Sequence, residues 1–141
     1  DSGIRVYGEQ RGAALCDFDG DGRVDLAVTQ NAAETKLYRN LAARPGLRVR
    51  LRGSPGNPEA IGATIRVGTP SVWGPARELH AGAGYWSQDS VVPVFATVRH
   101  PTHIWIRWPG GKTTQSEIPQ DAKEISLAPD GQVKTLHPNF P

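Results

Sequence analysis

The frequency of glycine and proline is the feature that most limits what this chain can fold into. Sixteen glycines and twelve prolines stand among 141 residues, which is well above their usual share in globular domains. Both residue types interrupt regular backbone structure, so they disfavour long helices and favour short strands joined by turns. No stretch shows a sustained apolar repeat of about 3.6 residues either. The sequence therefore predicts an all-β fold.

Alternation of apolar and polar side chains predicts the individual strands. In the clearest case, Leu47, Val49 and Leu51 share one face while arginines occupy the other, as in a half-buried antiparallel strand. Trp108 is in phase with the apolar residues before it, which assigns it to the core. A polar turn is predicted over residues 31–35. The other predicted strands cover residues 12–16, 24–30, 36–41, 63–67, 76–80, 91–98, 102–108, 112–118, 123–127 and 132–136.

A break at residues 42–46 predicts two units. Pro45 stops regular structure and Gly46 frees the backbone, so this stretch is typical of a linker. We expect residues 1–45 to form one unit and residues 46–141 an antiparallel β-sandwich or barrel-like domain. The overall charge of +2 is too balanced to indicate a nucleic-acid partner. No apolar run approaches the roughly 18 residues of a transmembrane segment.

The single cysteine gives no information about the cellular compartment. Cys16 has no second cysteine in this chain, so no internal disulfide can form. It follows an apolar stretch and precedes a row of carboxylates, which raise the pKa of a thiol rather than lower it. We expect a buried and unreactive thiol.

An acidic loop is the one motif with a defined chemistry. Its carboxylates stand at loop positions 1, 3, 5 and 9 and come from Asp17, Asp19, Asp21 and Asp25. Carboxylates so close together repel one another unless a cation neutralises them. Gly22 permits a sharp turn that brings the carbonyl of Arg23 inward as a further ligand. This set of hard oxygen donors favours Ca²⁺ over Mg²⁺, which prefers a tighter octahedron, and over Zn²⁺, which prefers His or Cys.

The context of the loop differs from that of a helix–loop–helix calcium hand. Position 12 of such a hand is a Glu, whereas here it is Val28, inside an apolar strand-like run. The sequence thus predicts a calcium loop within a β-hairpin, anchored in a core by Leu15, Leu26 and Val28. The alternative is an acidic turn without metal, but such a turn gives no reason for four converging acids.

The acidic loop and the residues after it resemble a known repeat. The order Asp-Phe-Asp-Gly-Asp-Gly-x-x-Asp-Leu over residues 17–26, followed by Leu-Tyr-Arg-Asn over 37–40, is similar to an FG-GAP/VCBS repeat. Such repeats are β-propeller blades of integrin alpha subunits and of many secreted bacterial proteins. The resemblance implies a calcium-binding partial blade over residues 1–45. Because a propeller needs several blades, we expect this chain to be the C-terminal part of a longer protein.

Residues 46–127 resemble the ASPIC/UnbV domain, which follows such repeats in the cartilage acidic protein family. The matching stretches are residues 47–51, 60–63, 82–88 and 106–112. The resemblance implies an extracellular or periplasmic protein with a role in adhesion, and it carries over no catalytic residue. Proteins of the UnbV type are encoded with enediyne antibiotic pathways. At residues 95–98 the sequence departs from the aromatic-Gly-Leu-Gly pattern of the family, so we expect that turn to differ.

Two surfaces are candidates for partner binding. Arg48, Arg50 and Arg52 on one strand face could hold sulfate, phosphate or a carboxylate-rich partner. The alternative is a solvated face that discourages edge pairing. Trp86 and Trp105 could belong to a platform for sugar stacking or protein docking, and the sequence leaves open whether they lie in the core or on the surface.

A nearby group of polar residues does not point to catalysis. His80, Ser87 and Asp89 lie close together in the sequence, but nothing around them resembles a nucleophile elbow. A polar loop after Gly84 is the simpler interpretation.

The expected function is that of a non-enzymatic, calcium-binding module that mediates adhesion by binding a protein or a glycan. One alternative is an enzyme or accessory protein of enediyne-type secondary-metabolite biosynthesis, which would need a deep pocket with convergent polar groups. Another is a structural subunit whose missing blade strands come from a second chain.

Overall fold

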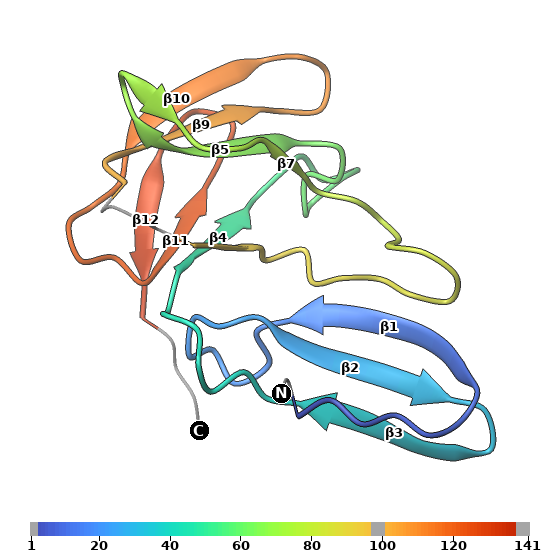
Figure 1. Cartoon of the computed structure of the whole chain (residues 1–141). Helices are drawn as coiled ribbons and strands as arrows, with labels where there is room; N and C mark the ends of the chain where they lie inside the picture. Colours follow the sequence, from blue (N-terminus) through green and yellow to red (C-terminus); the bar gives the residue numbers. More distant parts are fainter. Residues whose placement is uncertain (1–2, 97–100, 138–141) are drawn as a thin grey trace.

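The strands of this protein form three sheets in the part of the chain that the structure describes. The computed structural model describes residues 3–96 and 101–137, and these contain strands but no helix (Figure 1). The all-β prediction is confirmed, and no described helix is long and apolar enough to cross a membrane. The strands are β1 (Gln10–Cys16), β2 (Asp25–Gln30), β3 (Ala33–Tyr38), β4 (Leu47–Leu51), β5 (Thr64–Thr69), β6 (Val72–Trp73), β7 (Arg77–Glu78), β8 (Val94–Phe95), β9 (His103–Arg107), β10 (Thr113–Glu117), β11 (Glu124–Leu127) and β12 (Val133–Leu136).

The first sheet is an antiparallel meander in the order β1-β2-β3. Its second hairpin is tighter than predicted, because β3 begins at Ala33 and Ala32 adopts a left-handed φ of 53°. Of the three predicted core anchors, Val28 is buried and Leu26 is half-buried. The prediction for Leu15 is wrong: it is 46% exposed, because it lines an open cleft of about 400 Å³ rather than a packed core.

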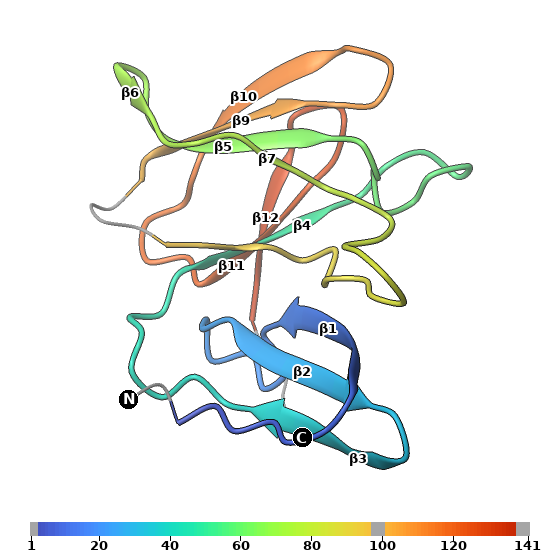
Figure 2. The ribbon, with the colours of Figure 1, turned by 45° about the vertical axis from the view of Figure 1, so that its right-hand side comes forward.

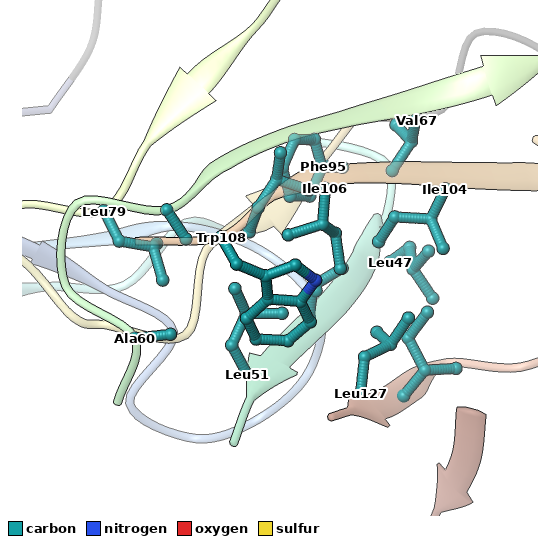
Figure 3. Close-up of a cluster of buried hydrophobic side chains, with 14 residues drawn as sticks. Leu47, Leu51, Ala60, Val67, Leu79, Phe95, Ile104, Ile106, Trp108 and Leu127 are labelled. Atoms are coloured by element: carbon teal, nitrogen blue, oxygen red, sulfur yellow. The ribbon is translucent and has the colours of Figure 1, made fainter. Parts of the chain in front are cut away.

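The second and third sheets enclose the main core. One has the order β10-β9-β5-β6, with β7 also paired to β5, and the other has the order β12-β11-β4-β8. Their inner faces, together with adjoining loop residues such as Ala60 and Leu79, carry the cluster drawn in Figure 3. Trp108 belongs to it as predicted: it is 4% exposed, and its Nε1 donates a hydrogen bond of 2.8 Å to Thr114 Oγ1. The largest fully buried apolar side chains are Val49, Ile65, Ile104, Ile106, Ile125 and Leu127.

The architecture of this larger part differs from the prediction in two ways. None of the described sheets closes into a barrel. In addition, β4 pairs with β11 in parallel, whereas antiparallel pairing was predicted throughout. A parallel pair needs a long connection, and here residues 52–123 supply it. The strand predicted over 91–98 is reduced to β8, and residues 97 and 98 lie outside the described residues.

The predicted linker is tied to the acidic loop by hydrogen bonds. The amide of Gly46 donates to the carbonyl of Gly22 at 2.8 Å, and Arg23 Nε donates to the carbonyl of Ala43 at 2.6 Å. The β1–β3 sheet lies apart from the two larger sheets in both views, and the chain between β1 and β2 lies at the end of this sheet nearest β4 and β11 (Figures 1 and 2). The segment predicted as a linker therefore fastens this end of the sheet.

Candidate metal centre

The acidic loop connects β1 to β2 and brings three of its carboxylates together. Asp17, Asp19 and Asp21 each offer an oxygen, and these oxygens all lie within 4.8 Å of one another. The turn that achieves this needs left-handed backbone at two positions, Gly20 with φ 67° and Gly22 with φ 83°. Glycine adopts such angles without steric cost, which explains why the motif alternates Asp with Gly.

Hydrogen bonds inside the loop fix the orientation of these carboxylates. The amide of Gly22 donates to Asp17 Oδ2 at 2.8 Å, the amide of Asp21 donates to Asp19 Oδ1 at 3.2 Å, and the amide of Arg23 donates to Asp21 Oδ1 at 2.9 Å. Each bond uses one oxygen of its carboxylate. Such Asx-type contacts stabilise tight turns.

Asp25 has a different position from the other three. Its side chain is among the most deeply buried polar groups, at 1% exposure. Its Oδ2 accepts a hydrogen bond from the amide of Phe18 at 3.2 Å, and its Oδ1 accepts one from the amide of Asn40 at 2.7 Å. Asp25 thus joins the start of the loop to the chain after β3. Its role as a metal ligand stays a prediction, as does that of the Arg23 carbonyl.

Each of the three clustered carboxylates also forms an ion pair with an arginine. Asp21 Oδ2 lies 2.8 Å from Arg23 Nη1, and Asp19 Oδ2 lies 2.5 Å from Arg39 Nε. Asp17 Oδ2 lies 2.5 Å from Nη1 of Arg48 on β4. Burial raises the pKa of Asp21, but the side-chain and backbone hydrogen bonds from Arg23 outweigh it, so the pKa lies below its usual range. Sequence reasoning found the acids and missed these cations, because two of the arginines lie outside the loop.

Two oxygens of the cluster are left without a hydrogen bond. Asp17 Oδ1 and Asp19 Oδ2 are buried and find no hydrogen-bond donor among the described residues. The contact of Asp19 Oδ2 with Arg39 is therefore an ion pair without hydrogen-bond geometry, whereas Asp17 Oδ1 has neither. A buried acceptor without a partner is costly and is rare in native proteins. A cation bound between these hard oxygens would satisfy them, so the residues present fit a calcium ion.

The three arginines of the predicted row on β4 differ in how far their surroundings bury them. Both interpretations of this row place Arg48 on an exposed face, but it is only 8% exposed, because the acidic loop and β11 cover it. Arg50 is more exposed and donates to Glu124 at 3.3 Å, and Arg52 Nε donates to Ser126 Oγ at 3.1 Å. The alternation of faces is confirmed, but the three side chains do not form one free anion-binding surface.

The structure does not bring the two predicted tryptophans together on one element. Trp86 lies in the loop between β7 and β8 and is 82% exposed, next to Tyr85 at 70%. Their rings lie edge to face with centroids 6.0 Å apart. Trp105 lies on β9 and is half-buried.

The polar residues of this loop hold it against β1. Ser87 Oγ accepts a hydrogen bond from the amide of Ala13 at 3.0 Å, and Asp89 Oδ1 accepts one from the amide of Leu15 at 2.8 Å. Among the described residues no hydrogen bond or ion pair joins His80 to either of them, and its Nδ1 lies 3.8 Å from Glu78 Oε1. Ser87 and Asp89 therefore satisfy backbone donors of the edge strand β1.

Cys16 is half-buried rather than fully buried. Burial raises the pKa of its thiol, and the nearby carboxylates of Asp25, Asp17 and Asp89 raise it further. This direction agrees with the expectation of an unreactive thiol.

A comparison with protein families assigns the larger part of the chain. The family model described as ASPIC and UnbV matches residues 53–135, which is more than half of the chain and covers β5 to β11 and most of β12. A comparison with curated proteins finds no match. The chain therefore belongs to the ASPIC and UnbV family.

Proposed function

We propose that this chain is a non-enzymatic, calcium-binding module of an extracellular or periplasmic protein, and that it mediates adhesion by binding a protein or glycan partner. One observation carries the proposal: three converging carboxylates leave a buried oxygen, Asp17 Oδ1, without any partner among the described residues. Calcium is the common biological cation that takes such a set of oxygen ligands. The resemblance of residues 17–40 to an FG-GAP/VCBS repeat supports the same site.

The role proposed for calcium is structural. A bound divalent cation would supply positive charge at the point where the oxygens of Asp17, Asp19 and Asp21 converge. It would hold together a loop that connects β1 to β2 and that also contacts the segment leading into β4. Extracellular modules bind Ca²⁺ with a dissociation constant of about 10⁻⁴–10⁻³ M, which suits a compartment with millimolar calcium.

Arginine neutralisation is the competing interpretation of the same loop. Arg23 and Arg39 already pair with acids of the cluster, so the loop could be stable as a purely electrostatic turn. The two interpretations differ in their response to the metal. A loop neutralised by arginines gains nothing from Ca²⁺, whereas a calcium loop becomes more stable as the free Ca²⁺ concentration rises above the dissociation constant.

Thermal unfolding in calcium and in chelator tests the proposal. With 1 mM Ca²⁺ and a dissociation constant of about 10⁻⁴ M, binding to the folded state adds about 1.4 kcal/mol to the free energy of unfolding. We expect the unfolding midpoint to rise in Ca²⁺ and to rise much less in Mg²⁺. The variant Asp19→Asn should lose the response. Asp130→Asn is the matched control, because Asp130 has the same charge but lies in an exposed turn, where it accepts from the amide of Gln132. An unchanged wild-type midpoint would overturn the calcium proposal.

The aromatic loop tip supports the second half of the proposal, partner binding. Trp86 adopts a left-handed φ of 52°, which is unusual for a bulky residue, and it presents its ring to solvent. Strained backbone of this kind persists where the surrounding structure holds it, and it is concentrated at functional sites. Exposed Trp and Tyr side chains are typical anchors of interfaces.

An array of defined glycans separates the two classes of partner. Glycans that bind the wild-type chain and Val72→Ala, a control at another exposed apolar residue, but not Trp86→Ala, would support glycan binding at this tip. Absence of any bound glycan would overturn glycan binding and leave a protein as the proposed partner, whereas equal binding by Trp86→Ala would overturn this tip as the glycan site.

A further inference from the structure

One carboxylate of the acidic loop faces two different parts of the molecule. Asp17 Oδ2 accepts from the amide of Gly22 at 2.8 Å and from Arg48 Nη1 at 2.5 Å, while its Oδ1 has no hydrogen-bond partner among the described residues. The side chain is almost completely buried, at 1% exposure. One oxygen is thus engaged by the loop and by β4, and the other remains available to a metal.

Arg48 connects this carboxylate to the third sheet. Its Nη1 also donates to the backbone carbonyl of Asp17 at 3.3 Å, and its Nε donates to Glu124 Oε2 on β11 at 2.8 Å. Glu124 is 4% exposed, and its other oxygen accepts from Arg50 at 3.3 Å. Two carboxylates and two guanidinium groups therefore form a charge-balanced chain of contacts, mostly buried, from the acidic loop through β4 to β11.

The guanidinium fork is what makes this connection possible. Arginine has several donors in a fixed plane, so it can bind two carboxylates in different directions at once, whereas the lysine ammonium is a single point charge. The hydrogen bonds of Asp17 and Glu124 outweigh burial and raise the pKa of Arg48, so this cation stays charged. With Oδ2 of Asp17 held from both sides, its carboxylate group has little freedom to rotate.

We propose that Arg48 is a positioning residue for the acidic loop: it holds Asp17 by one oxygen, presents the other to calcium, and so couples metal binding to the attachment of the acidic loop to β4. This inference rests on the proposed calcium function. Its reciprocal form is that calcium strengthens the contact between the loop and β4, because coupling between two binding events acts equally in both directions.

The direction in which calcium affinity changes when Arg48 is removed distinguishes a positioning residue from a bystander, that is, a nearby cation that orients no metal ligand. A nearby cation repels Ca²⁺, so removal of a bystander arginine would tighten calcium binding. Removal of a positioning arginine instead frees the Asp17 carboxylate and weakens calcium binding. For Arg48→Met in the full chain, we expect isothermal titration to show a calcium dissociation constant at least fivefold higher than that of the wild type.

Further variants keep the test decisive if Arg48→Met does not fold. Arg48→Lys retains the charge without the fork and should also weaken calcium binding. Glu124→Gln changes the far end of the contact chain without touching the loop and should weaken it less. Arg52→Met is the matched control on the same strand face, because its described side-chain bond is to Ser126 and not to an acid, and it should bind calcium like the wild type.

A metal-free readout completes the experiment. In chelator, the changes in unfolding midpoint caused by Asp17→Asn and by Arg48→Met should not add up to the change in the double variant, since the two residues share one buried contact. Calcium binding by the wild type with unchanged or tighter binding by Arg48→Met or Arg48→Lys would overturn the inference and leave the proposed function intact. A wild-type chain that binds no calcium would overturn the proposed function and with it this inference.

Discussion

Substitution of Gly22 by alanine probes the turn on which the acidic loop depends. Gly22 has φ 83°, and a Cβ at this position would lie 3.1 Å from Pro45 Cβ and 3.2 Å from the carbonyl oxygen of Gly46. The methyl group would therefore meet two difficulties at once. It would occupy a left-handed backbone conformation, and it would crowd the segment that fastens the loop to β4.

The two costs can be estimated separately. A left-handed conformation costs an L-residue about 1–2 kcal/mol, and loss of glycine freedom in the unfolded chain returns about 0.4–1 kcal/mol. Crowding of a packed site adds about 1–3 kcal/mol. Gly22→Ala should thus lower the free energy of unfolding by about 1–5 kcal/mol, with a central value of about 3 kcal/mol. Gly110→Ala is the matched control, because Gly110 has φ 89° but nothing lies within 4 Å of the position that a Cβ would occupy, and it should cost about 1 kcal/mol.

Urea unfolding followed by circular dichroism in chelator measures both variants without any contribution from metal. The difference between them isolates the contact of the loop with Pro45 and Gly46. Equal loss of stability in Gly22→Ala and Gly110→Ala would refute the close packing of the loop against this segment. A Gly22→Ala chain as stable as the wild type would refute the left-handed turn itself.

Three further outcomes follow from burial and charge. Ile106→Ala should lower the unfolding free energy by about 2–5 kcal/mol, because Ile106 is fully buried. Val72→Ala, at a 69% exposed position, should change it by less than about 0.5 kcal/mol, and similar losses in the two variants would contradict the assigned core. The lowered pKa of Asp21 means that its pairing with Arg23 stabilises the fold above the ordinary carboxyl pKa of about 4 and that this contribution is lost as pH falls through the lowered value. In metal-free buffer, the stability difference between the wild type and Arg23→Met should therefore shrink on acidification, and a constant difference from neutral to acid pH would argue against the ion pair. Because burial and nearby carboxylates raise the pKa of Cys16, its alkylation at neutral pH should be slower than that of free cysteine and should accelerate at alkaline pH, and a rate equal to that of free cysteine would be inconsistent with this environment.

The parts of the fold that follow from local pattern could be predicted from the sequence. Alternation in β4 placed Leu47, Val49 and Leu51 in the core, and all three are buried. The phase of Trp108 was predicted in the same way. Period-2 alternation identifies the two faces of a strand because successive side chains point in opposite directions. It requires no knowledge of distant residues.

What covers a strand face could not be predicted in this way. Arg48 was expected on an exposed face, yet it is buried against Glu124, which is 76 residues away in the sequence. The parallel pairing of β4 with β11 places these residues side by side, and no local pattern encodes that pairing. The wrong prediction for Leu15 has a related cause. The sequence shows that this residue is apolar, but it does not show that the fold leaves an open cleft beside it.

The acidic loop shows the same division between local and distant information. The convergence of Asp17, Asp19 and Asp21 follows from their spacing and from the intervening glycines, and the structure brings the three together. The arginines that pair with Asp19 and Asp17 come from residues 39 and 48, after β3 and on β4. Their approach depends on the tertiary arrangement. The motif alone therefore suggested carboxylates without nearby cations, whereas the fold supplies arginine partners.

Isothermal titration of Ca²⁺ into the chelator-treated wild-type chain tests the central claim most directly. We predict one site with a dissociation constant of about 10⁻⁴–10⁻³ M, abolished by Asp19→Asn and retained by Asp130→Asn. Absence of calcium binding by the wild type, or undiminished binding by Asp19→Asn, would contradict it.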